Sequence, residues 1–166
     1  MRNLDEYAIM CKKELDNIGI QYGNIIEFKV NTRAKHRWGQ CKKIQGGYSI
    51  NINVVLLDER NSEKGLKETI IHEILHTCSD CKHHDINWKR YADMVNKAYG
   101  YHVKRVSSAQ EKGILYDTRD IKHKKANYVI KCERCGKKVV RQRASNLIKH
   151  PEQYCCGFCN GNFVRE

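Results

Sequence analysis

Residues His72-Glu73-Ile74-Leu75-His76 form an H-E-x-x-H pattern, a spacing with which one helix can bind a zinc ion. Side chains four positions apart lie on the same helical face, so both imidazoles can reach a single Zn²⁺. Glu73 follows the first histidine directly, so its carboxylate lies beside the metal, where it can act as a general base toward water. The motif therefore predicts a hydrolytic zinc site with ligands His72 and His76 and catalytic Glu73. The alternative is an ordinary amphipathic helix whose histidines bind no metal.

A catalytic zinc usually takes three protein ligands and leaves its fourth position to water, so a third ligand must follow. The metzincin pattern would require glycine at Ser79 and histidine at Lys82, and the sequence has neither. The next candidates are His83 and His84. We favour His84 because it opens a predicted helix and is followed four residues later by the aromatic Trp88.

Two further metal-binding pairs lie near the carboxyl end, Cys132-x₂-Cys135 and Cys156-x₂-Cys159, with 20 residues between them. This is the spacing of a zinc ribbon, in which two C-x₂-C turns close a tetrahedral four-thiolate site. Such a site lets a module of about 40 residues fold without a large apolar core. The sequence thus predicts one catalytic and one structural zinc.

Cys78-x₂-Cys81 lies between the predicted ligands His76 and His84. It could form another metal site or a thiol switch that disables the active site. We favour a plainer interpretation, because free cysteine is often buried and behaves as a small apolar residue.

Helical and alternating apolar patterns predict the elements that must position these residues. The helices are expected at about 4–18, 62–78 and 85–99, and the strands around 26–30, in the segment after Gly39 and around 48–52, with a hairpin at the Gly46-Gly47 pair. The expected fold is α+β, with helices and a small antiparallel sheet followed by a β zinc ribbon. The expected domains are 1–105 for the metal-dependent unit, 106–126 for a basic linker and 127–166 for the ribbon.

These motifs resemble the SprT-like family of zinc metalloproteases, which is related to the eukaryotic Spartan proteases. In that family a third histidine lies in an H-G-x-x-F/W motif, which His84 and Trp88 match, although Asp85 replaces the usual glycine. Many members end in a zinc ribbon, and the stretch Arg37-Trp-Gly-Gln-Cys41 also resembles the family's sheet region. The resemblance implies a zincin-like fold and a one-zinc endopeptidase whose Glu73 moves the proton from water to the leaving amine. Tyr91, Tyr99 and Tyr101 are available as oxyanion stabilisers, and the sequence selects none of them.

The net charge of +12 is concentrated in the tail, where residues 121–166 hold 11 Lys and Arg against 3 Asp and Glu. We expect the tail to bind nucleic acid through phosphates, with Lys137, Lys138, Arg141 and Arg143 between the two cysteine pairs. The resemblance implies protein substrates bound or crosslinked to DNA, as in the repair of DNA–protein crosslinks. The alternative is a non-enzymatic nucleic-acid-binding regulator that keeps a structural metal at His72, His76 and His84.

The mean hydropathy is −0.72, and no apolar run has the length of about 20 residues that a membrane-spanning helix needs. The amino-terminal segment becomes acidic where the apolar stretch of a signal peptide would begin. We therefore expect no membrane partner and a reducing cytoplasmic location, associated with the nucleoid if the source is bacterial. An odd number of cysteines, nine, fits metal binding in such a compartment better than a disulfide framework.

Overall fold

The computed structural model describes residues 1–79, 81, 83–117 and 128–165. Two compact units can be distinguished, Met1–Ile121 and Lys122–Glu166. The elements of the first unit are α1 (Leu4–Asn17), β1 (Ile25–Asn31), β2 (Gly39–Ile44), β3 (Gly47–Asn53), a 3₁₀ turn (Val54–Leu57), α2 (Glu63–Leu75) and α3 (Ile86–Tyr99). Those of the second are β4 (Tyr128–Cys132), β5 (Lys138–Arg141), α4 (Asn146–Lys149), a 3₁₀ turn (Pro151–Gln153) and β6 (Phe163–Arg165). The expected α+β class is confirmed.

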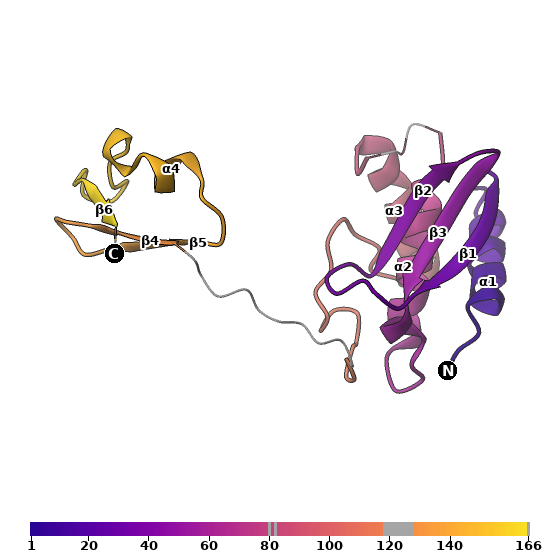
Figure 1. The fold of residues 1–166 in the computed structure, drawn as a ribbon. Coiled ribbons are helices and arrows are strands. Elements are labelled where there is room, and N and C mark those ends of the chain that lie inside the picture. The colour runs from indigo at the N-terminus through magenta and orange to yellow at the C-terminus, as the bar shows by residue number, and fades with distance from the viewer. Residues whose placement is uncertain (80, 82, 118–127, 166) are drawn as a thin grey trace. The chain divides into compact units, whose positions relative to one another are not determined.

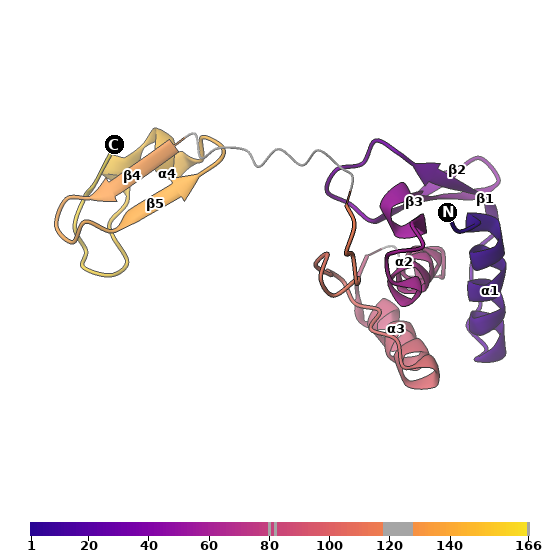
Figure 2. The same ribbon diagram turned by 90° about the horizontal axis from the view of Figure 1, so that it is seen from below.

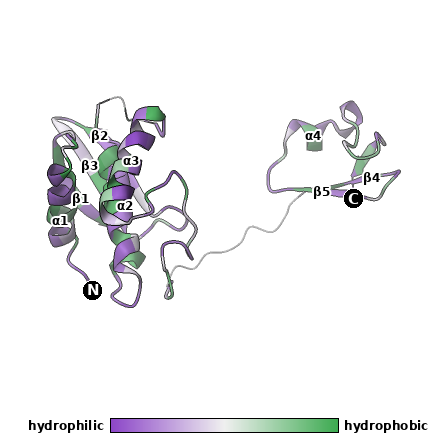
Figure 3. Ribbon diagram, turned by 180° about the vertical axis from the view of Figure 1, so that it is seen from behind, coloured by the Kyte–Doolittle hydropathy of each residue, from purple (hydrophilic) through white to green (hydrophobic). Residues whose placement is uncertain are grey.

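In the first unit, three helices cover one face of a three-stranded sheet (Figure 1). The view from below shows α2 between α1 and α3, all on the same side of the sheet (Figure 2). The core lies between these layers and includes Leu15, Ile50, Ile52, Ile70 and Ile74, none of which is more than 1% exposed. The central helix α2 carries both hydrophobic and hydrophilic residues (Figure 3), and nine of its 13 residues are buried, so it is held by contacts on several sides.

The sheet has the order β1-β3-β2 and is mixed, so the expectation of an antiparallel sheet was wrong in part. The hairpin at Gly46 makes β2 and β3 antiparallel, and Gly46 has the positive φ of 81° that a tight turn requires. However, β1 pairs with β3 in parallel. Alternation along a strand reveals which face is buried but not the direction of its neighbour, and β3 lies between the two strands that precede it in sequence.

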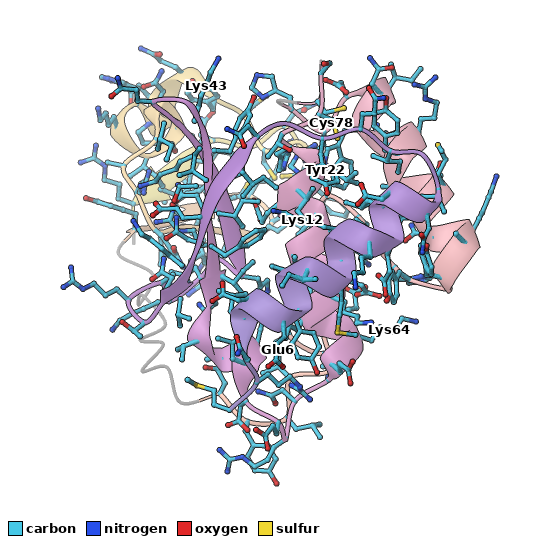
Figure 4. The ribbon with its side chains drawn as sticks, turned by 90° about the vertical axis from the view of Figure 1, so that its right-hand side faces the viewer. Glu6, Lys12, Tyr22, Lys43, Lys64 and Cys78 are labelled. Carbon is cyan, nitrogen blue, oxygen red and sulfur yellow. The ribbon has the colours of Figure 1, made fainter. Side chains whose placement is uncertain are left out.

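The helix ends follow from local capping. Ser62 accepts a hydrogen bond from the Gly65 N–H at the start of α2, and Asp85 accepts one from the Trp88 N–H at the start of α3. Gly100, with φ 66°, ends α3 in the left-handed conformation. Along α1, the side chains of Glu6 and Lys12 can be followed in Figure 4, and the Lys12 ammonium lies 5.4 Å from the centre of the Phe28 ring of β1.

The predicted linker begins at residue 106, but its first part packs on the metal-dependent unit. The Ser62 N–H donates to the Gly113 carbonyl, and the Asn61 side chain accepts hydrogen bonds from the backbone of Leu115 and Tyr116. Polar composition suggested a linker here, whereas these bonds anchor the segment to the start of α2. The remainder of the predicted linker, from residue 118, lies outside the described residues.

In the part of the chain that the structure describes, no helix is long and apolar enough to cross a membrane.

The close approach of this segment to α2 predicts a steric requirement at Gly65. A Cβ at that position would overlap the backbone carbonyl of Lys112. Alanine normally stabilises a helix interior more than glycine does. Here the steric overlap with the Lys112 backbone should outweigh that gain, and we expect Gly65→Ala to lower the free energy of unfolding by about 1–3 kcal/mol. Thermal unfolding beside Lys64→Ala, an exposed change on the same helical turn, measures the effect. Equal midpoints for the two variants would contradict the packing described here.

Candidate metal centre

Three histidines converge at the carboxyl end of α2. His72 and His76 lie one turn apart, and His84 lies two residues before α3. The Nε2 atom of His72 is 3.3 Å from that of His76 and 3.0 Å from that of His84. The structure therefore brings together the three residues that the sequence singled out. His83, the other candidate, is exposed and lies outside this group.

Backbone carbonyls fix the Nδ1 atoms of two of these rings, the nitrogens that do not take part in the Nε2 cluster. His72 Nδ1 lies 3.1 Å from the Lys104 carbonyl oxygen, and His76 Nδ1 lies 3.1 Å from that of Cys81. Since a carbonyl can only accept, each Nδ1 carries the proton and each Nε2 presents a lone pair. Burial lowers the pKa of His72 to about 3 and also lowers the pKa values of His76 and His84, which favours the neutral, metal-binding form.

The donor set fits zinc. Neutral imidazole lone pairs facing one another at 3.0–3.3 Å repel unless a cation lies between them. Nitrogens about 2.0–2.1 Å from a tetrahedral zinc ion are about 3.3–3.4 Å apart, close to the spacing here. Three imidazoles also leave one position of a tetrahedral ion open, as in catalytic zinc sites.

Trp88 explains how His84 is directed toward the other two histidines. Its ring is 1% exposed, and its centre lies 4.8, 5.8 and 4.6 Å from the ring centres of His72, His76 and His84. Asp85, in the position where glycine was expected from the family pattern, caps α3 by accepting from the Trp88 N–H at 3.0 Å. The aspartate thus keeps the turn and fixes the start of the helix that carries Trp88.

Glu73 is 6% exposed and lies against strand β2. The Cys41 N–H hydrogen-bonds its carboxylate, and a Cβ on Gly39 would come within 2.5 Å of its Oε1 atom. Burial raises the pKa of Glu73 to about 7, against the opposing effects of that N–H and of the charges on Lys112 and Arg37. A carboxyl group with a pKa in this range can both accept and release a proton near neutral pH.

A cleft of about 210 Å³ opens beside His72 and Glu73. Its lining includes Trp38 and Gly39 at the start of β2, the segment 104–107, Thr69 and Lys112. The cleft leads to the Glu73 side chain from the side of β2. Sequence analysis identified His72 and Glu73 in this wall, but it missed Gly39, Lys112 and the carbonyls of Lys104 and Cys81, since backbone contacts leave no residue-type signature.

The tyrosines considered as oxyanion stabilisers have different surroundings. The Tyr99 hydroxyl donates to the Glu14 carbonyl at 2.7 Å, and the Tyr101 hydroxyl donates to the Glu14 carboxylate at 3.0 Å. Both hydroxyls therefore bind α1 and not the cleft. Tyr91 lies under the Arg90 guanidinium, 5.2 Å from its ring centre. None of the three lines the cleft.

Cys78 and Cys81 are both buried, and burial raises the pKa of Cys78 to about 12. A thiol in this state reacts poorly with oxidants. The backbone carbonyl of Cys81 holds the His76 ring.

The four predicted cysteines of the second unit form a separate cluster. Cys132 Sγ lies 3.4 Å from Cys159 Sγ, and Cys135 Sγ lies 3.7 Å from Cys156 Sγ. Sulfurs about 2.3 Å from a tetrahedral zinc ion are about 3.7–3.8 Å apart. Backbone N–H groups of Phe158 and Cys159 lower the pKa of Cys156 to about 7, which favours the thiolate form. Both candidate sites are therefore consistent with zinc.

The two cysteine turns have the same backbone design. Gly136, with φ 72°, and Asn160, with φ 56°, each follow the second cysteine of a pair in the left-handed conformation. Strand β4 pairs with both β5 and β6, and it ends at Cys132. A Cβ on Gly161 would come within 2.9 Å of Cys132 Sγ, so a larger residue would disturb the cluster. Cys155 is exposed and is not one of the four.

The basic residues named in the sequence analysis all lie exposed on the second unit: Lys137, Lys138, Arg141 and Arg143. Lys138 and Arg141 begin and end β5. The Lys137 ammonium lies 4.5 Å from the centre of the Phe158 ring, which is 74% exposed. Phe158 was missed as a surface residue because an aromatic inside a C-x₂-C pair can equally be part of a small core.

Comparison with protein families gives a match to the SprT-like family over residues 13–109. The match includes α2, the three histidines and Glu73, and it ends before the four-cysteine unit. A search of curated proteins gave no match.

The convergence of the histidines predicts which substitution removes a metal ion. Full-length protein purified with zinc should hold two ions per chain, and His84→Ala should hold one, because two imidazoles bind zinc far more weakly than three. His83→Ala serves as the matched control and should keep both ions. Elemental analysis after dialysis measures the ratio. Loss of an ion from the His83 variant instead would contradict the assignment.

Proposed function

The chain belongs to the SprT-like family, and on this premise we propose that it is a zinc-dependent endopeptidase acting on proteins bound or crosslinked to DNA. The observation that supports it most is the convergence of three imidazoles, one of which, His72, lines an open cleft together with the buried Glu73. The family match over residues 13–109 includes the three histidines and Glu73.

In this mechanism His72, His76 and His84 hold the zinc ion. A zinc ion held there would supply a Lewis acid for the scissile carbonyl and for the attacking water. Glu73 accepts a proton from the attacking water and passes it to the leaving amine. The Cys41 N–H holds the carboxylate at the wall of the cleft, and the absence of a side chain on Gly39 leaves room for it.

The alternative is a nucleic-acid-binding regulator in which the histidines hold a metal for structure alone. A structural zinc site is normally closed by four protein ligands. Among the described residues, the histidine cluster offers three. A buried carboxyl group beside an open position has no purpose in a closed site, so the enzyme is the stronger candidate.

The second unit supports targeting to nucleic acid. Its exposed cations, among them Lys137, Lys138, Arg141 and Arg143, can neutralise phosphates, and the exposed Phe158 ring beside Lys137 offers a surface on which an unpaired base can stack. Stacking accepts any base, so we propose binding to single-stranded DNA with little sequence preference. The zinc ribbon would bring the endopeptidase unit to proteins on DNA.

The proposed role of Glu73 predicts that Glu73→Gln retains both zinc ions and loses activity by about 10²–10⁴-fold, the usual contribution of a general base. The loss is measured by following the cleavage of a basic DNA-binding protein on gels. The zinc-loaded parent and the variant are each assayed with and without single-stranded DNA. The parent should cleave, and DNA should increase the rate. If neither protein cleaves any substrate although both zinc sites are filled, the regulator is the better interpretation.

The proposed nucleic-acid surface predicts a strong dependence on salt. Changing Lys137, Lys138, Arg141 and Arg143 together to glutamine should weaken binding to single-stranded DNA and flatten its logarithmic salt slope by up to about 3, at about 0.7 for each lost phosphate contact. A control with four exposed lysines of the first unit changed to glutamine, Lys13, Lys64, Lys89 and Lys97, should bind as the parent does. Equal slopes for both variants, measured by fluorescence anisotropy, would contradict the assignment.

A further inference from the structure

The cleft beside the histidines is basic. Its lining includes His36, Lys104, Arg105 and Lys112, and Glu73 is the one carboxylate among these lining residues. Lys104 is ion-paired with Glu111, so its charge is compensated at the rim. Lys112 differs from the others because it is buried.

The fold brings Lys112 to this position through backbone contacts. The Ser62 N–H donates to the Gly113 carbonyl, and Gly113 has a φ of 62°, which turns the chain back at this point. The Lys112 carbonyl lies against Gly65, where no side chain intervenes. From there the lysine lines the cleft together with Thr69, His72 and Glu73, which lie one and two turns further along α2. Its 5% exposure shows that the stem is covered.

The ammonium group of Lys112 has no ion pair among the described residues. The two nearby carboxylates of α2 have other partners: Glu68 accepts from the His102 N–H at 2.7 Å, and Glu73 accepts from the Cys41 N–H. A charge kept in a largely buried position without a direct partner costs stability. Such a charge, opening into a cleft, is suited to an anion that arrives with the ligand.

We propose that Lys112 selects substrates that carry an acidic side chain next to the scissile bond, an inference that rests on the proposed endopeptidase function. The cleft borders His72 and Glu73, so a side chain that enters it belongs to a residue flanking the bond under attack. A volume of about 210 Å³ suits one aspartate or glutamate side chain. Its carboxylate accepts a charge-assisted hydrogen bond from the Lys112 ammonium, while Arg105 disfavours a basic side chain.

The experiment uses the zinc-loaded full chain and peptides that differ only at the two residues flanking the cleaved bond, with Glu, Gln or Lys in turn. We expect kcat/KM to be about tenfold higher for Glu than for Gln at one flanking position, and lowest for Lys. Lys112→Met should reduce the Glu-to-Gln ratio to about one, and Lys112→Arg should retain a preference for Glu. Lys64→Met, an exposed change near the start of α2 (Figure 4), should keep the parent ratio.

The ratio distinguishes selection from a merely structural role, because loss of folding lowers both rates together. Thermal unfolding of each variant accompanies the kinetics. Cleavage without Glu-to-Gln discrimination at either position, or an unchanged ratio in Lys112→Met, would overturn this inference and leave the endopeptidase standing. Failure to cleave any peptide would instead contradict the proposed function. If single-stranded DNA inhibits the parent but not Lys112→Met, the cleft takes a phosphate, and the inference is wrong.

Discussion

The candidate site depends on one constraint, the fixing of the imidazole Nδ1 atoms by backbone carbonyls. The carbonyls of Lys104 and Cys81 hold the protons of His72 and His76 on the outer nitrogens, so the inner nitrogens present lone pairs to one point. The Cys81 carbonyl lies in the segment that follows α2, and the Lys104 carbonyl lies in the segment that follows α3. The remaining architecture keeps those segments in place, through the cap at Asp85 and the packing of Trp88.

Two groups of opposite charge line one cleft. Glu73 is buried against the edge of β2, where only glycine fits at position 39, and Lys112 reaches the cleft from a chain segment that packs on Gly65. A buried carboxyl group can transfer a proton near neutral pH, and a covered ammonium can attract a carboxylate. Gly39 therefore leaves room for the Glu73 carboxylate beside β2, and Gly65 lets the segment that carries Lys112 approach α2.

The sequence predicted the parts of the site that have a fixed spacing. His72, His76 and the two cysteine pairs follow from motif geometry alone, and the helices follow from apolar periodicity and caps. The parallel pairing of β1 with β3 was missed, because a strand pattern does not encode its neighbour's direction. Lys112 was missed for a related reason. Its polar, basic segment has the composition of a linker, and only the backbone contacts at Ser62 and Gly65 show that it belongs to the cleft.

Zinc X-ray absorption on the loaded full chain tests most directly whether the histidines form a separate site with an open position. Subtracting the spectrum of a His72→Ala protein isolates that site from the four-cysteine cluster. We predict a shell of nitrogen and oxygen alone, at about 2.0–2.1 Å, with three imidazoles and one solvent oxygen. A sulfur scatterer at about 2.3 Å in the difference spectrum would show that Cys78 or Cys81 closes the site, and would contradict an open, hydrolytic centre.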